Sequence, residues 1–269
     1  MGNIFNLNRF GKYFAHDLRN AKNYYSISLL ILSLMPVIMY IFTLLFKRII
    51  TGEWGISGRS SQISAFFISW ITIVLSFPVK VYGRITDKKA GSDWLLLPAS
   101  GFEKWLSIVL ITCVVLPVAY GVLFFGSDAL MSALIPSYGD AAITYFSTVE
   151  QLVNEWSSGI VSVKTFPILY INAVEVILFF TLGAIHFKKS KASKTILAWI
   201  GLGILASIVS MWIFRTTHIS TSDLEDMAQN AGAIEAFASK FNGLFSVSYI
   251  VIIGATLAGI YARIKTMKQ

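Results

Sequence analysis

The sequence predicts an all-α membrane protein with six transmembrane helices, an N-terminal amphipathic interface helix and both termini in the cytoplasm. Six long apolar runs are separated by loops whose charge alternates in sign. Hydrophobic residues make up 55% of the 269 residues and charged residues 13%, against roughly 25% charged residues in a soluble domain. A helix that crosses the bilayer core needs about 20 apolar residues, and each run is close to that length.

The six expected spans follow the apolar runs along the chain. They cover residues 25–46, 63–82, 105–125, 167–187, 195–214 and 244–261. Pro36, Pro78 and Pro117 fall inside the first three spans, where proline is expected to kink a helix. No internal repeat is visible, which disfavours transporter folds built from inverted repeats. The chain is therefore expected to form one transmembrane domain over residues 1–269.

The distribution of basic residues predicts the orientation. Sixteen of the 22 lysines and arginines lie in the N-terminal arm, in the loops after the second and fourth runs with the edges of those loops, or in the C-terminal tail. Lysine and arginine collect on the cytoplasmic side of membrane proteins, so both termini are expected inside. The net charge of +8 then arises from residues that face anionic lipid. It does not call for a nucleic-acid partner.

The arm over residues 1–24 has a helical pattern. Its apolar residues share one face and its basic residues lie on the opposite face: Ile4, Leu7, Phe10, Phe14 and Leu18 against Arg9, Lys12 and Arg19. A basic amphipathic helix beside a first span is expected to lie in the membrane interface. Two interpretations stay open, a general membrane anchor and a helix that also docks a partner.

The loop between the second and third spans has the clearest local signals. Ser100 and Glu103 have the spacing of a capping box, which predicts that the third helix begins near Ser100. Upstream, Ser92 is expected to cap a helix of one to two turns through Trp94 and Leu97. A short apolar helix in the cytoplasm is costly unless it contacts lipid or a partner, so this loop is a candidate partner site.

Glu175 is the only charged residue near the centre of an expected span, and Asn172 lies three residues earlier on the same helical face. Ionisable residues at that depth are costly and usually face a cavity or a partner. One interpretation is that Glu175 lines a substrate path or takes up protons. The other is a structural hydrogen bond between helices, with Asn172 in the same network.

The motifs of common catalytic sites are absent from the sequence. There is no His-Glu-x-x-His zinc motif, no Gly-x-Ser-x-Gly nucleophile motif and no Gly-x-x-x-x-Gly-Lys-Ser/Thr phosphate loop. The single cysteine, Cys113, lies inside the third expected span. The chain is therefore not expected to be an enzyme or to hold a metal or cofactor of its own.

The layout of an amphipathic arm, six spans and a structured second loop resembles the type-2 family of ABC exporter permeases. Residues 88–104, which read KKAGSDWLLLPASGFEK, are similar to a segment of bacterial members of that family. The longest outside segment follows the third span here, whereas in the better-known members it follows the fifth.

The resemblance implies a multi-pass protein of the bacterial cytoplasmic (inner) membrane that exports an amphipathic or hydrophobic substrate. It also implies a second permease copy, identical or different, and a separate cytoplasmic ATPase subunit that holds ATP and magnesium. The loop over residues 84–97 would be the coupling element, and the arm would be the interface helix beside it. The residues expected to contact the ATPase are Arg84, Asp87, Lys88, Lys89, Trp94, Leu96 and Leu97.

Two functions of other classes stay open. One is an ion- or proton-coupled carrier or channel that uses Glu175 and needs no ATPase. The other is a membrane scaffold or immunity protein that transports nothing and only recruits a partner at its cytoplasmic face.

Overall fold

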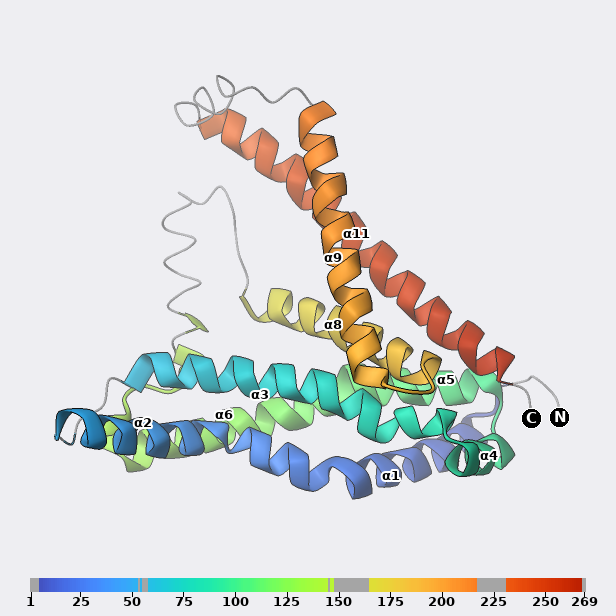
Figure 1. The fold of residues 1–269 in the computed structure, drawn as a ribbon, viewed down its shortest axis with the longest axis horizontal. Coiled ribbons are helices and arrows are strands. Elements are labelled where there is room, and N and C mark those ends of the chain that lie inside the picture. The colour runs from blue at the N-terminus through green and yellow to red at the C-terminus, as the bar shows by residue number, and fades with distance from the viewer. Residues whose placement is uncertain are drawn as a thin grey trace.

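The computed structural model describes residues 5–52, 54, 58–144, 146–147, 165–216 and 231–267. All the regular elements among these residues are helices, and none is a strand, so the all-α prediction is confirmed. Within the same ranges, five helices are long and apolar enough to cross a membrane, or six when one bent pair counts as a single span. The protein is a multi-pass α-helical membrane protein (Figure 1).

The first two helices make up the bent pair. Helix α1 (Leu7–Ser33) begins after Asn6, whose side chain accepts hydrogen bonds from two backbone amides, and α2 (Met35–Thr51) follows after one residue. The bend between them is 42° and lies just before Pro36, which lacks the amide hydrogen needed to continue the helix. The predicted kink is therefore confirmed. The helix shows no break at the arm boundary near residue 24, and the membrane-plane position of the arm stays a prediction.

The second span and the loop after it form three elements. Helix α3 (Gly58–Val81) leads into the 3-10 turn η1 (Gly83–Thr86) and then into α4 (Lys88–Leu96). The short loop helix was expected, but its predicted start at Ser92 is wrong. Residue Asp87 is the N-cap, and the helix already exists four residues before Ser92.

The third span is longer than its apolar run. Helix α5 (Gly101–Leu110), the π-helical turn η2 (Ile111–Val115) and α6 (Leu116–Leu134) join into one run of 34 residues. The π-helical turn ends just before Pro117, where the missing proline amide disturbs the regular hydrogen-bond ladder. A 3-10 turn, η3 (Pro136–Tyr138), follows.

The last three apolar runs correspond to α8 (Thr165–His186), α9 (Lys191–Thr216) and α11 (Ala231–Thr266). Helix α8 packs against α3, α9 and α11. Figure 1 shows α9 and α11 leaving the layer of α1, α2, α3 and α6. Only 6% of the apolar stretch of α9 is buried, so its surface is available to lipid or to another chain.

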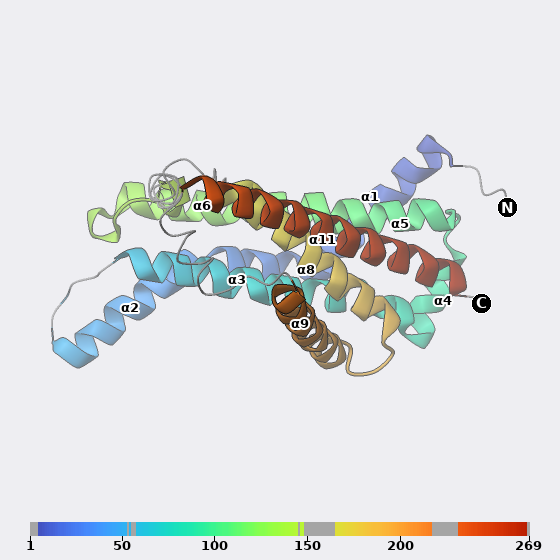
Figure 2. The same cartoon turned by 90° about the horizontal axis from the view of Figure 1, so that it is seen from above.

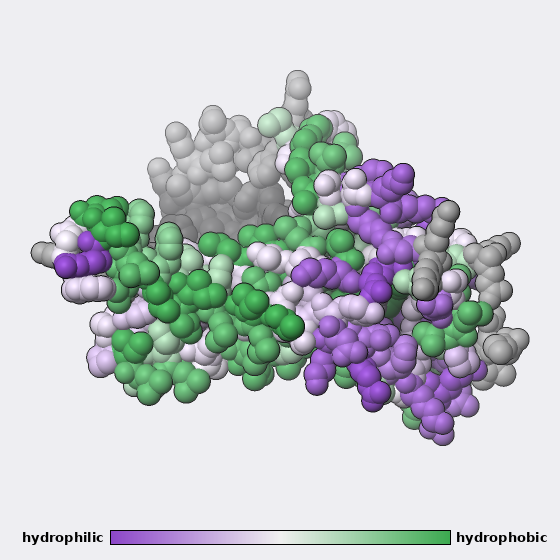
Figure 3. Space-filling model, turned by 60° about the horizontal axis from the view of Figure 1, so that its bottom comes forward, coloured by the Kyte–Doolittle hydropathy of each residue, from purple (hydrophilic) through white to green (hydrophobic). Residues whose placement is uncertain are grey.

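Polar surface is concentrated at one end of the molecule. Figure 3 shows hydrophilic side chains gathered at the end where α4 lies, and a mostly apolar surface over the rest of that face. The start of α1 and the end of α11 also lie at this end (Figures 1 and 2). This segregation fits a chain whose two ends share one side of a membrane. The assignment of that side as cytoplasmic stays a prediction.

Candidate partner-coupling site

Helix α4 packs against the bundle through Trp94, which is 9% exposed. The indole nitrogen of Trp94 donates a hydrogen bond of 3.0 Å to the hydroxyl of Tyr13 on α1. From α5, the buried Lys104 amine donates to the carbonyl oxygens of Trp94 (2.9 Å) and Leu95 (3.3 Å) and lies 4.5 Å from the centre of the indole ring. A cation at the last carbonyls of a helix is favourable, so α1 and α5 together hold the last turn of α4.

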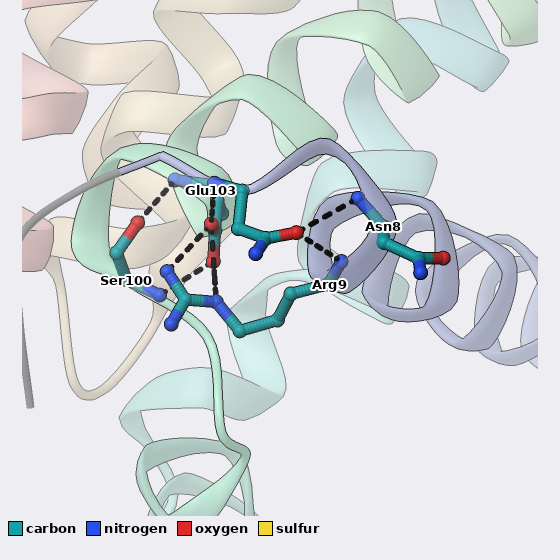
Figure 4. A network of polar contacts seen from close by, with 5 residues as sticks. Asn8, Arg9, Ser100 and Glu103 are labelled. Atoms are coloured by element: carbon teal, nitrogen blue, oxygen red, sulfur yellow. Dashed lines mark hydrogen bonds and ion pairs between the residues drawn. The ribbon is translucent and has the colours of Figure 1, made fainter.

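The starts of α1 and α5 are joined by the fully buried carboxylate of Glu103 (Figure 4). It accepts hydrogen bonds from Arg9 Nε (2.8 Å) and Nη2 (2.7 Å) and from the backbone amides of Asn6 (3.0 Å) and Ser100 (2.8 Å). The Ser100 hydroxyl accepts in return from the Glu103 amide, which confirms the predicted capping box. Charge-assisted bonds of this kind are stronger than neutral ones, so the carboxylate caps one helix and anchors another.

The beginning of the loop contacts α9 and makes a second contact with α1. The carboxylate of Asp87 forms an ion pair of 2.9 Å with Lys191 at the start of α9, and the same amine donates to the carbonyl of Gly83. The guanidinium of Arg84 lies 3.9 Å from the centre of the Tyr24 ring on α1, a cation–π contact. The loop is therefore bound to α1, α5 and α9.

The outer face of α4 exposes few side chains. Ser92, Asp93 and Leu96 are exposed, and Leu96 keeps 71% of its surface in contact with solvent. Leu97 is the half-buried C-cap residue. Lys88 and Lys89 form the first turn of α4, and the structure describes only their backbone.

The expected contact residues therefore fall into two groups. Trp94 and Arg84 pack inward and mount α4 on the bundle, whereas Leu96 faces outward. Replacement of Trp94 would disturb the contacts with Tyr13 and Lys104 that hold α4 on the bundle. Leu96 is the position that tests contact with a partner.

A buried carboxylate, Asp17, lies behind α4. The Ser107 hydroxyl of α5 donates to Asp17 Oδ2 at 2.6 Å, and the Tyr82 hydroxyl is buried beside it. Asp17 is eight residues before the predicted first span. Burial raises the pKa of Asp17 to about 6, although the Ser107 hydrogen bond and the charge of His16 act in the opposite direction.

The sequence alone did not predict the contacts of Tyr13, Asp17, Lys104 or Lys191. Tyr13 and Asp17 belong to the buried stripe of α1, which also contains Ala21 and Tyr25. The four-residue spacing of this stripe was a signal that could have identified it as a buried face. The apolar stripe of the arm is larger and predicts a different buried face. Lys104 and Lys191 carried no such signal, because their partners are distant in the chain or are backbone carbonyls.

The structure places Asn172 and Glu175, the two residues of the expected intramembrane polar site, in different surroundings. On α8, Asn172 accepts a 2.9 Å hydrogen bond from the Tyr249 hydroxyl of α11 and lines an apolar cavity of about 590 Å³ between α3, α6, α8 and α9. Glu175 is 8% exposed and does not line this cavity. Among the described residues, Glu175 forms neither a hydrogen bond with Asn172 nor an ion pair.

No group of three or more histidine, cysteine, aspartate or glutamate side chains that could hold a metal ion is present in the described part of the chain. The chain matches no protein-family model, no curated protein and no solved structure. The fold thus defines the class, a multi-pass α-helical membrane protein, and the function is inferred from the site.

Proposed function

We propose that this protein is the membrane-spanning permease subunit of an ATP-driven exporter of the type-2 ABC kind. A separate cytoplasmic ATPase would supply the ATP and magnesium site, since the chain carries no phosphate loop. The observation that carries the proposal is the attachment of α4, a short helix that is held on the bundle through Trp94 and leaves Asp93 and Leu96 exposed to a partner.

The contacts of α4 provide a route for force. A push on the outer face would reach α1 through Trp94 and Tyr13, and α5 through Lys104. The Asp87–Lys191 ion pair adds a link to α9. Coupling between distant sites is carried by packed and hydrogen-bonded contacts of this kind. In the proposed alternating-access cycle, these links tilt the second and third spans about Pro78 and Pro117.

The apolar cavity between α3, α6, α8 and α9 supports an amphipathic or hydrophobic substrate. Its lining includes Trp70, Tyr120 and Trp199, with Asn172 among the few polar residues. Binding pockets of this size are typically apolar, with a few polar groups that orient the ligand. The exposed surface of α9 leaves room for the second permease copy.

The test is a mild-detergent pull-down of the tagged chain from its native host, with mass spectrometry and an ATPase assay of the eluate. A stoichiometric nucleotide-binding subunit is expected, and Leu96→Glu should release it. The matched control is Leu134→Glu, because Leu134 is 75% exposed at the end of α6. Absence of a nucleotide-binding subunit would reject the permease. A bound ATPase without transport would favour the scaffold or immunity role.

One observation favours a second candidate, the ion- or proton-coupled carrier or channel. Glu175 is a buried carboxyl in a membrane helix, without a hydrogen bond or ion pair to any described residue, and ionisable residues inside a membrane often mark a proton or ion pathway. In proteoliposomes without an ATPase, Glu175→Gln should then abolish pH-driven flux at every pH. Flux that is unchanged by this substitution would exclude the carrier.

A further inference from the structure

A second groove, of about 650 Å³, lies beside α4. It is formed by η1 and α4 on one side, and by the end of α11 and the segment after α8 on the other. Its polar lining includes Thr86, Ser92, Lys188 and Arg263. Asp87 and Leu96, two of the residues expected to contact the ATPase, also line this groove, whereas Lys188 and Arg263 are not among those residues.

The groove lies where apolar helices end. Helix α8 ends at His186, α9 begins at Lys191 and α11 ends at Thr266, and all three are long and apolar enough to cross a membrane. Lys188 and Arg263 are therefore at the level where a bilayer core gives way to lipid headgroups.

Two cations in the groove lack a carboxylate partner among the described residues. Lys188 is exposed, and the Nε atom of Arg263 is buried without a hydrogen-bond acceptor. Asp87 is the acid among the residues that line the groove, and it is already paired with Lys191. A buried donor without an acceptor is costly, so the groove is suited to an anion.

Apolar side chains line both sides of the groove. Leu95 and Met267 line it and are half-buried. An occupant thus meets two cations, three hydroxyl groups and hydrocarbon side chains in one groove. A free anion would use only the polar groups.

We propose that this groove binds one anionic phospholipid. The lipid phosphate would be held by Arg263 and Lys188, and the first part of an acyl chain would pack on Leu95 and Met267. Arginine matches phosphate through its planar set of donors, and basic pockets between transmembrane helices on the cytoplasmic side are known to suit anionic headgroups. The proposal does not depend on an ATPase partner.

The experiment measures lipid binding to the purified full chain by native mass spectrometry, with phosphatidylglycerol and phosphatidylcholine as probes. Preferential binding of phosphatidylglycerol is expected. The double variant Lys188→Gln with Arg263→Gln should weaken it about 25-fold, since each basic residue near a membrane surface contributes roughly a fivefold factor. Unfolding temperatures in phosphatidylcholine micelles check that the variant is folded.

The matched control is Lys194→Gln with Lys265→Gln, which removes the same charge from exposed residues outside the groove. This pair should leave the binding nearly unchanged. An equal loss of phosphatidylglycerol binding in the two double variants would overturn the proposal, and so would equal binding of phosphatidylglycerol and phosphatidylcholine by the parent protein. Full competition by inorganic phosphate would show a free-anion site and overturn the lipid assignment. Release of a protein partner by the groove variant, without lipid preference, would also overturn it.

Discussion

At the scale of single residues, burial separates side chains that look alike in the sequence. Trp94 and Leu96 are two residues apart in the same short helix, yet one is 9% exposed and the other 71%. Arg9 and Lys12 both look like solvent-facing charges, but Arg9 forms an ion pair with a carboxylate that has no exposed surface. The partner of each residue, rather than its type, determines its role.

The Arg9–Glu103 pair allows a test by a double-mutant cycle. Arg9→Ala leaves the buried carboxylate of Glu103 without its cation, which is strongly unfavourable. We therefore expect Arg9→Ala to lower the unfolding temperature clearly, and to lower it much less when Glu103 is already glutamine. The measurement is thermal unfolding in detergent of all four proteins. Additive effects of the two substitutions would contradict the interaction.

Asp17 predicts a pH dependence of stability. Its pKa of about 6 in the folded protein exceeds the ordinary value of 3.8, so the folded state binds the proton more tightly. Stability should rise as the pH falls from above 6 toward 4, by roughly 3 kcal/mol at 1.36 kcal/mol per pKa unit. Measurements of the free energy of unfolding between pH 4.5 and 8 should show this rise in the stability of the parent protein. The slope should be much smaller in Asp17→Asn.

The control for that experiment is Asp93→Asn. Asp93 is an exposed acid that lines the same small groove beside α4 as Asp17. The pH slope of this variant should equal that of the parent protein. A slope that persists in Asp17→Asn would assign it to another group.

At the scale of elements, α4 depends on a close approach to η1. A Cβ atom at Gly91 would collide with the carbonyl of Ile85, and a backbone carbonyl has little freedom to move away. Gly91→Ala should therefore displace α4, lower the unfolding temperature and weaken capture of the ATPase.

Gly11 supplies the control for this substitution. An added Cβ at Gly11, on the exposed side of α1, meets nothing within 4 Å. Gly11→Ala should stabilise the protein by up to about 1 kcal/mol, because alanine favours a helix over glycine. Equal behaviour of the two alanine variants would mean that α4 does not require the contact with η1.

At the scale of the whole molecule, the polar end carries α4, the start of α1 and the end of α11. Cysteine labelling in a Cys113→Ala background tests which side this end faces. A membrane-impermeant thiol reagent applied to intact cells should label Leu134→Cys and spare Leu96→Cys. Both leucines are well exposed, so a reversed pattern would place α4 and both termini outside the cell.

The helices and their caps follow from local sequence. Apolar runs of about 20 residues can satisfy their backbone polar groups in lipid only as helices, and the Ser100–Glu103 box involves residues three apart. Pro36 ends a helix because it lacks an amide hydrogen. All of these could be predicted because cause and effect lie within one or two helical turns.

The assembly around α4 was decided by the tertiary structure alone. The Trp94–Tyr13 hydrogen bond joins residues 81 apart in the chain, and the Arg9–Glu103 pair joins residues 94 apart. No periodicity encodes such pairings, since they depend on how α1, α4 and α5 meet. The sequence by itself determined a helical membrane protein with a short loop helix. Packing decided that Trp94 mounts this helix and Leu96 faces outward.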